Sequence, residues 1–184
     1  YETEFSNVGR SVHTLAVKAT NRFEQTRDIV KSYINAKHRE EIVFTKGATE
    51  AINLAASTFG ERYINHGDEI LITELEHHSN YLPWMNICKN SNLELKIIPV
   101  DQNGIIDEQQ IIDNCNEKTK MIAITHMSNV TGQILDVKKI KNNISKNILI
   151  SLDGCQSIAH CDIDVQDLDC DFYSFSSHKL YGPS

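Results

Sequence analysis

Lys179 stands in the run Ser-Ser-His-Lys-Leu-Tyr-Gly-Pro, between an apolar strand-like segment and a Gly-Pro turn. An amine in such a place can form a Schiff base with a carbonyl cofactor, which is the chemistry that pyridoxal phosphate enzymes require. A lysine taken alone is most often a solvated surface residue. The interpretation of Lys179 therefore depends on which other side chains the fold brings to it.

Pyridoxal phosphate also needs a carboxylate for its pyridine nitrogen, donors for its phosphate and a group over its ring. Asp153 ends an apolar run and can supply the carboxylate, although a turn or helix-cap role is the alternative. Gly47-Ala48-Thr49 at a helix start offers backbone N–H groups, a hydroxyl and the positive end of a helix dipole. His77 can stack on a ring and move protons near neutral pH, although a lone histidine is usually structural. Ser176 and His178 can add phosphate donors beside the lysine.

The elements that must position these residues follow from the spacing of apolar positions. One helix is predicted from about Ser11 to Asn35, and a second opens at Lys46–Glu50. Further helices are predicted around 79–89, 107–115 and 137–145, and strands at 41–45, 69–73, 93–100, 121–125, 148–153 and 171–176. This alternation predicts an α/β fold with a mainly parallel sheet and crossover helices. Because ligands collect at the carboxyl ends of parallel strands, five strand ends would deliver Thr, His, Asn, Asp, Gln, Ser and Lys to one edge.

Composition restricts the class of protein. The chain has 184 residues, with 18 basic and 25 acidic side chains and a net charge of −7. No apolar run approaches the roughly 20 residues of a membrane span. The scattered basic residues predict no nucleic-acid partner and no binding to a membrane surface. The five cysteines are odd in number and form no C-x-x-C pair, which favours reduced thiols in a cytosol-like compartment.

A metallohydrolase is the competing interpretation of the polar residues. It would use His77, His78, His126 and Asp153. Two adjacent histidines project in different directions, however, and no H-E-x-x-H spacing occurs. The acidic run at 162–171 lacks the glycine and terminal glutamate of a calcium loop. We therefore predict no metal site.

Six runs of residues carry a resemblance to a known family. They are Lys-Gly-Ala-Thr-Glu-Ala-Ile-Asn at 46–53, Glu-His-His-Ser-Asn at 76–80 with Pro83-Trp84, Thr-His-Met-Ser-Asn-Val-Thr-Gly at 125–132, Asp-Gly-Cys-Gln at 153–156, Asp-Cys-Asp-Phe-Tyr at 169–173, and Ser-Ser-His-Lys-Leu-Tyr-Gly-Pro at 176–183. In order and over essentially the whole chain, they resemble the Suf-type (group II, selenocysteine lyase-like) cysteine desulfurases. These are class V aminotransferases of pyridoxal phosphate fold type I.

The resemblance implies a role for each matching residue. Lys179 would bind the cofactor covalently and then move protons, and His77 would stack on the ring and assist proton transfer. Asp153 would pair with the pyridine nitrogen, Gln156 with the ring hydroxyl, and Asn129 would lie near that hydroxyl and the substrate. The implied cofactor-binding set is Ala48, Thr49, His77, Asn129, Asp153, Gln156, Ser176, His178 and Lys179. Two departures are Ala48, where the family often has Thr, and Cys155, where it commonly has Ala and which we interpret as a packing residue.

The implied reaction converts L-cysteine to L-alanine and passes the sulfur as a persulfide to an acceptor protein for iron–sulfur cluster assembly. L-selenocysteine stays open as a second substrate. Family members are homodimers whose nucleophilic cysteine and carboxylate-binding arginine lie downstream of the lysine, in a C-terminal domain. The chain begins with Tyr1 and ends five residues after Lys179. We therefore expect 1–184 to be most of the large domain, without the small domain, and the isolated segment to be inactive.

Two alternatives remain at this point. One is another class V enzyme, such as a kynureninase-like hydrolase or a small-molecule aminotransferase. The other is a non-catalytic remnant built on a truncated desulfurase fold. A cytoplasmic location is expected, and a plastid location stays open because a transit peptide could precede Tyr1.

Overall fold

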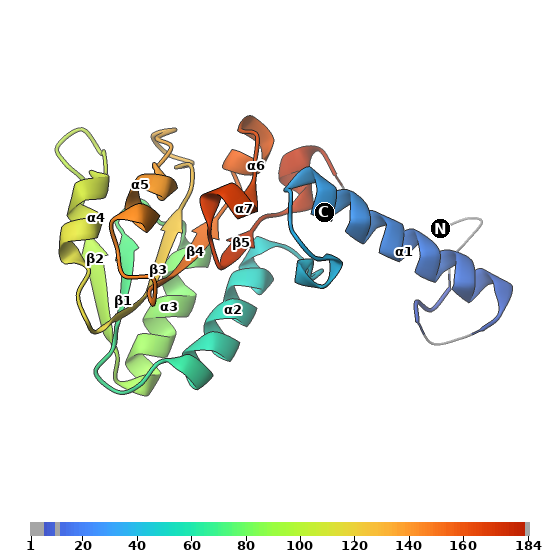
Figure 1. Cartoon of the computed structure of the whole chain (residues 1–184), viewed down its shortest axis with the longest axis horizontal. Coiled ribbons are helices and arrows are strands. Elements are labelled where there is room, and N and C mark those ends of the chain that lie inside the picture. The colour runs from blue at the N-terminus through green and yellow to red at the C-terminus, as the bar shows by residue number, and fades with distance from the viewer. Residues whose placement is uncertain (1–5, 10–11, 183–184) are drawn as a thin grey trace. The chain divides into compact units, whose positions relative to one another are not determined.

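A computed structural model describes residues 6–9 and 12–182, apart from the side chains of residues 60–62 (Figure 1). The chain divides into two compact units, Tyr1–Val43 and Phe44–Ser184. Within the described residues, no helix is both long enough and apolar enough to span a bilayer. The extent of the large domain stays a prediction.

The first unit is built on one long helix, α1 (Thr14–Tyr33). This helix confirms the one predicted from the apolar spacing, although the predicted start at Ser11 lies outside the described residues. His13 caps its first turn, because the His13 Nδ1 accepts a hydrogen bond from the Ala16 N–H at 3.3 Å. A short 3-10 helix, η1 (Arg39–Glu41), follows, and the Arg39 guanidinium pairs with the Asp28 carboxylate of α1.

The strand predicted at 41–45 is wrong. Residue 41 ends η1, and 42–45 have no regular structure. The Ile42 carbonyl accepts a hydrogen bond from the Arg27 guanidinium instead of a neighbouring strand. Val43 and Phe44 are 65% and 40% exposed, so the run is not a buried strand. Its β-branched and aromatic residues indicated a strand, but a strand also needs a partner edge, which the sequence pattern cannot supply.

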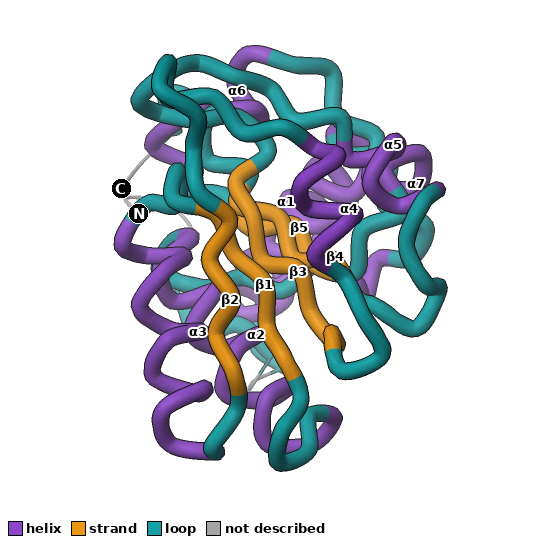
Figure 2. The backbone as a smooth tube through the Cα atoms, turned by 90° about the vertical axis from the view of Figure 1, so that its left-hand side faces the viewer, coloured by secondary structure: helices purple, strands orange, loops and turns teal. Residues whose placement is uncertain are grey.

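The second unit contains a five-stranded parallel sheet in the order β2-β1-β3-β4-β5 (Figure 2). Each strand lies inside or overlaps a predicted run, so the parallel α/β prediction is confirmed. Their bounds are β1 (Glu69–Thr73), β2 (Glu94–Ile98), β3 (Thr119–Thr125), β4 (Leu149–Asp153) and β5 (Phe172–Ser174).

Helices cover both faces of this sheet (Figure 2). On one face, Ile52 and Trp84 pack against Ile70 and Ile72 of β1. On the other face, Ile111 and other helix residues pack against the alternate strand positions. Strands buried on both faces read as continuous apolar runs, which is why the sequence revealed them. The helices are α2 (Ala48–Tyr63), α3 (His78–Ser91), α4 (Glu108–Asn114) and α5 (Val137–Asn142).

Three short helical segments were not predicted. They are α6 (Ser157–His160), α7 (Val165–Leu168) and the 3-10 helix η2 (Ser177–Leu180). Each is four residues long, so it contains barely one turn and shows no helical period in its sequence.

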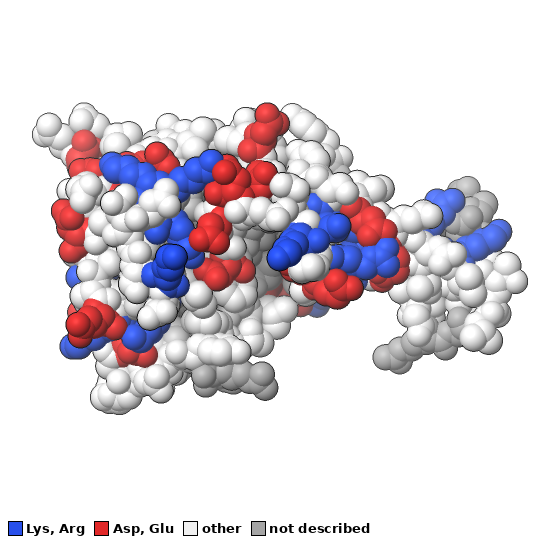
Figure 3. Space-filling model, viewed as in Figure 1, with Lys and Arg blue, Asp and Glu red and all other residues white. Residues whose placement is uncertain are grey.

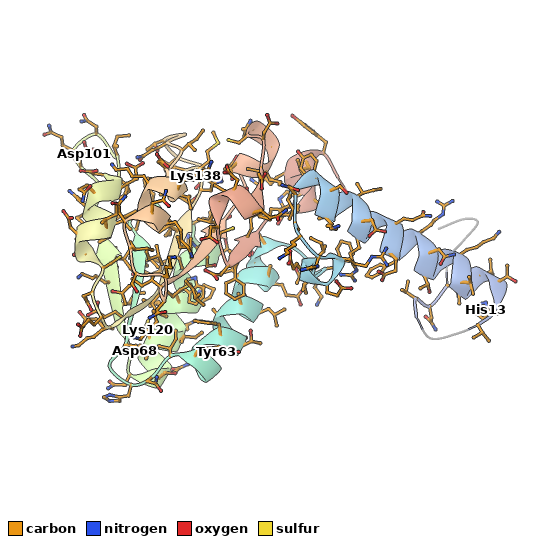
Figure 4. All side chains as sticks on the ribbon, in the orientation of Figure 1. His13, Tyr63, Asp68, Asp101, Lys120 and Lys138 are labelled. Atoms are coloured by element: carbon orange, nitrogen blue, oxygen red, sulfur yellow. The ribbon has the colours of Figure 1, made fainter. Side chains whose placement is uncertain are left out.

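The two edges of the sheet carry different side chains. Asp68, just before β1, and Lys120, near the start of β3, form an ion pair of 3.8 Å at the amino edge, and Asp101 lies towards the opposite edge (Figure 4). On the face shown in Figure 3, lysines and acidic residues are interspersed. Lys141 of α5, for example, lies 3.8 Å from Asp169 and 3.7 Å from Asp171. The polar residues singled out in the sequence lie at the carboxyl edge.

Candidate active site

A cavity of about 280 Å³ lies at the carboxyl edge of the sheet in the second unit, close to the lower limit of about 300 Å³ for small-molecule sites. The structure brings all nine of the predicted cofactor-binding residues to its wall. The full lining is Ala48, Thr49, His77, Ser79, Thr125, Met127, Asn129, Asp153, Cys155, Gln156, Ser176, His178 and Lys179.

The first turn of α2 forms one part of the wall. The Ala48 N–H donates to the Ser176 Oγ at 2.8 Å, which joins this turn to the segment after β5. A Cβ at Gly47 would lie 3.2 Å from the same oxygen, and Gly47 has a φ of 152°. Glycine therefore allows both the backbone conformation and the close approach. The 16-residue helix places its positive end and the Thr49 residue at the cavity.

Asp153 forms a second part of the wall at the end of β4. It is 4% exposed, and its Oδ1 accepts a hydrogen bond from the Cys155 N–H at 3.0 Å. Tyr173 of β5 packs so closely on Gly154 that a Cβ there would lie 2.3 Å from the Tyr173 Cζ. The Tyr173 hydroxyl is in turn 2.8 Å from the Ser157 Oγ. A buried carboxylate is thus held in a fixed orientation at the cavity.

Lys179 lies in η2, which begins directly after Ser176. The Lys179 N–H donates to the Ser176 carbonyl at 3.1 Å, and the Gly182 N–H donates to the Ser177 carbonyl at 3.0 Å. A Cβ at Gly182 would lie 2.9 Å from that same carbonyl oxygen. This compact turn carries the exposed side chains of His178 and Lys179 to the cavity.

His77 is the N-cap of α3. Its Nδ1 accepts a hydrogen bond from the Ser79 N–H at 3.2 Å and lies 2.7 Å from the Ser79 Oγ. Asn129 comes from a tight turn after β3, closed by the Gly132 N–H donating to the Ser128 carbonyl at 3.0 Å. Gln156 follows β4 two residues after Gly154 and is half-buried. These three side chains reach the cavity from different loops.

Sequence reasoning missed several residues around the cavity. Ser79, Thr125 and Met127 line it, and each lies within four residues of a predicted site residue, which is the signal that could have found them. Burial and the charge of Asp153 raise the pKa of the Cys155 thiol to about 12. Burial raises the pKa of Glu76 to about 7. A strand-end pattern gives no indication of burial at a single side chain.

The residues of the metal alternative are not all brought together. Neither His78 nor His126 lines the cavity with Asp153. His126 is buried, and its Nδ1 has no hydrogen-bond partner among the described residues. Within that part of the chain, no three His, Cys, Asp or Glu side chains are grouped as metal ligands.

The residues at the cavity fit pyridoxal phosphate in three respects. The first turn of α2 and the Ser176 hydroxyl offer donors to an anion. Asp153 offers a buried carboxylate to a protonated ring nitrogen. Lys179 supplies an amine within the same cavity. The phosphate, the ring nitrogen and the carbonyl of the cofactor could thus each bind a group of suitable chemistry.

Comparison with known proteins establishes the family. The profile of the family described as aminotransferase class-V matches residues 1–184. The chain belongs to this family. The prediction of a class V, fold type I protein is thereby confirmed, and families of this class depend on pyridoxal phosphate.

Individual relatives carry more specific names. The chain is 44% identical to a cysteine desulfurase of Pectobacterium atrosepticum, over 100% of this chain and 46% of that protein. It is 47% identical to a probable cysteine desulfurase of Staphylococcus epidermidis, over 100% of this chain and 45% of the relative. The chain therefore spans about half the length of these curated relatives.

Solved structures agree in fold. A cysteine desulfurase from Thermococcus onnurineus matches with a TM-score of 0.89 and 36% identity, over 99% of this chain and 45% of that one. The cysteine desulfurase CsdA from Escherichia coli matches with a TM-score of 0.85 and 35% identity, over 97% of this chain and 45% of that one. The Suf-type subtype and the roles of the nine residues stay predictions.

Proposed function

We propose that this chain is the cofactor-binding part of a cysteine desulfurase, an enzyme that converts L-cysteine to L-alanine and passes the sulfur to a protein thiol as a persulfide. One observation carries the proposal. A single cavity joins an amine, a buried carboxylate and a helix N-terminus in a class V chain that is 44% identical to a named cysteine desulfurase.

The cofactor, when bound, would supply an electron sink for the charge that develops at the substrate α-carbon. Asp153 would hold a proton at the ring nitrogen, because a buried carboxylate stabilises a neighbouring positive charge. The Cys155 N–H holds the Asp153 Oδ1 in place, so this carboxylate needs no reorganisation. Asp153 thus prepares the site before any substrate arrives.

The negatively charged phosphate needs hydrogen-bond donors, and the first turn of α2 and the residues beside Lys179 would supply them. The Thr49 and Ser176 hydroxyls, the His178 ring and the N–H groups of α2 would bind the phosphate. Gln156 and Asn129 would orient the ring hydroxyl. These contacts would fix the plane of the ring against Asp153.

Lys179 and His77 are the two groups that would move protons. The Lys179 amine would take the proton from the substrate α-carbon, and the His77 ring would act beside it, since both side chains line the same cavity. An imidazole ring has two nitrogens that can accept and donate protons, which suits His77 to this role.

The remaining assignments belong to the same proposal. We infer a Suf-type homodimer that supplies sulfur to an acceptor protein for iron–sulfur cluster assembly. A related solved structure is described as SspA in complex with cysteine, and it matches with 30% identity and a TM-score of 0.86. All five cysteines are free thiols, which supports a reducing compartment such as the cytoplasm.

Product analysis on the full-length protein tests the proposal. With L-cysteine and a reducing thiol, we expect alanine and sulfide in equal amounts, and neither from the Lys179→Ala variant. L-Selenocysteine serves as a second substrate in a parallel assay. Turnover of kynurenine or of an amino-group acceptor, with no alanine from cysteine, would replace the proposal with another class V activity.

A further inference from the structure

Glu76 lies in the turn between β1 and α3, one residue before His77, and no role has been given to it above. Its Oε1 accepts a hydrogen bond from the Thr73 Oγ1 at 2.6 Å. Its Oε2 accepts one from the Asn80 Nδ2, also at 2.6 Å. The carboxylate therefore ties the last residue of β1 to the first turn of α3.

This contact continues into the core through Asn80 and Trp84. The Trp84 indole N–H donates to the Asn80 Oδ1 at 3.1 Å, and both side chains are fully buried. Asn80 thus has a fixed amide orientation, with its oxygen towards Trp84 and its nitrogen towards Glu76. A buried amide with both ends bonded cannot rotate without losing a hydrogen bond.

The same residues hold the backbone of His77. The N–H groups of Asn80 and Tyr81 donate to the His77 carbonyl at 2.8 and 2.9 Å. Asn80 therefore contacts both sides of this turn. Its side chain donates to the Glu76 carboxylate, and its backbone N–H donates to the His77 carbonyl. Any movement of the Glu76–Asn80 pair would move the residue that presents its ring to the cavity.

The donors around Glu76 suit a carboxylate and not an amide. The Thr73 hydroxyl, the Asn80 amide and the Thr125 backbone N–H all favour the ionised form, while burial and the charge of Asp153 oppose it. The Asn80 Nδ2 and the Thr125 N–H can only donate, and the Thr73 hydroxyl donates to Glu76 as well, so two accepting oxygens satisfy all three donors whereas an amide offers only one. The arrangement depends on acceptors at both oxygens.

We propose that Glu76 is a positioning residue of the cofactor pocket, whose hydrogen bonds to Thr73 and Asn80 fix the β1–α3 turn and thereby the ring of His77. The inference rests on the proposed function for the identity of the ligand. It goes beyond the proposed function because it assigns a role to Glu76, which does not line the cavity.

Three variants of the full-length protein separate this role from bulk stability. Glu76→Gln keeps the shape but leaves one accepting oxygen in place of two, so its NH2 group either faces the Asn80 Nδ2 or forces the Thr73 hydroxyl to become an acceptor. The double variant Glu76→Gln with Asn80→Asp restores both bonds with donor and acceptor exchanged, and the new carboxylate can still accept from Trp84. Glu74→Gln is the matched control, because Glu74 lies two residues away and accepts instead from the Val100 N–H at 2.8 Å, away from the cavity.

The readouts are the dissociation constant of pyridoxal phosphate, the visible circular dichroism of the bound cofactor, and the Tm of the cofactor-free protein, at about pH 8, where a carboxyl with a pKa of about 7 is mostly ionised. We expect Glu76→Gln to weaken binding about tenfold and to reduce the visible band. The double variant should return both to within about twofold of wild type, and Glu74→Gln should change neither.

Equal binding and equal spectra for Glu76→Gln and Glu74→Gln would overturn the inference. So would a double variant with the Tm of the wild type whose binding and visible band are not restored. If Glu76→Gln does not fold, the double variant decides the matter alone by the same criteria. A wild-type protein that binds no pyridoxal phosphate would overturn the proposed function, whereas wild-type binding without differences among the variants would overturn only this inference.

Discussion

Gly154, the residue after Asp153, has no room for a side chain. The Tyr173 ring occupies the space where a Cβ of Gly154 would stand, and its hydroxyl lies 2.8 Å from the Ser157 Oγ. The Gly154 N–H also donates to the Ser174 carbonyl at 2.8 Å, which continues the pairing of β4 with β5. Gly154 is therefore required by packing at the site.

Gly154→Ala should destabilise the full-length protein by about 1–3 kcal/mol, because the new methyl group would overlap the Tyr173 ring. Urea unfolding measures the change, and pyridoxal phosphate binding should weaken with it. Gly132→Ala is the control without a steric overlap. Nothing lies within 4 Å of a Cβ built at Gly132, so only its φ of 75° opposes alanine there. Equal stabilities of wild type and Gly154→Ala would contradict the packing account.

Because its pKa is raised, Glu76 should make the stability of the folded protein depend on pH. Its pKa rises from 4.5 to about 7 because burial disfavours the charged form. Between these values the folded protein holds a proton that the unfolded chain has released, so this contribution to stability is present below pH 4.5 and is lost as the pH rises through 7. The loss is at most about 3 kcal/mol.

A glutamine at position 76 cannot ionise, so Glu76→Gln removes this pH-dependent contribution to stability. Urea unfolding of wild type and variant between about pH 5 and 8 should show the stability of the wild type falling relative to that of the variant. The charged group that contributes to the shift from outside this turn is Asp153. Parallel stability curves for the two proteins would disprove the raised pKa.

Residues at strand ends were predictable because the sheet edge collects them whatever their exact contacts. Lys179, Asp153 and His77 were found in this way, and all three line one cavity. Glu76 was given no role and Cys155 only a packing role, because burial at a single side chain depends on segments remote in sequence. Local pattern carries no information on that burial.

At the scale of elements, one hydrogen bond joins the two parts of the predicted phosphate site. The Ala48 N–H at the start of α2 donates to the Ser176 Oγ, 128 residues away in sequence. This bond places the positive end of α2 beside the turn that carries Lys179. Elements from opposite ends of the second unit thus come together at the predicted anion site.

Ser176→Ala should weaken pyridoxal phosphate binding by the full-length protein about tenfold, because the variant loses a hydroxyl donor and leaves the Ala48 N–H without this partner. Fluorescence titration measures the change. Ser57→Ala is the control on the same helix, since Ser57 is exposed and its hydroxyl donates only to the Leu54 carbonyl of α2. Affinities that match in the two variants would remove Ser176 from the phosphate site.

Regular elements were predictable where burial leaves a periodic apolar pattern, as in the long helices, or a continuous apolar run, as in the central strands. The central strands β1, β3 and β4 are almost wholly buried and mostly apolar because helices cover both faces of the sheet. The run at 41–45 has similar residues but no partner strand, and its carbonyl at Ile42 bonds a side chain instead. α6 and α7 have four residues each, too few to show a period.

At the scale of the whole molecule, this chain covers about half the length of its curated relatives, and we propose turnover as a property of the longer protein. The one thiol among the cavity-lining residues is Cys155. Burial raises its pKa to about 12, so this thiol stays almost wholly protonated at neutral pH. Such a thiol is a poor nucleophile for sulfur.

The isolated 184-residue chain should therefore release no alanine from L-cysteine, even when it is saturated with pyridoxal phosphate. Amino-acid analysis of the reaction measures this, with the full-length protein as the positive control. Multiple turnovers by the isolated chain would refute the claim that the sulfur-accepting group lies outside it.

The central claim is that the cavity holds pyridoxal phosphate on Lys179. The most direct test is to incubate the protein with pyridoxal phosphate, reduce with borohydride, digest, and locate the modified lysine by mass spectrometry, in this chain and in the full-length protein. We expect a phosphopyridoxyl group confined to Lys179. Labelling spread over many lysines of the full-length protein, or none at Lys179, would contradict it.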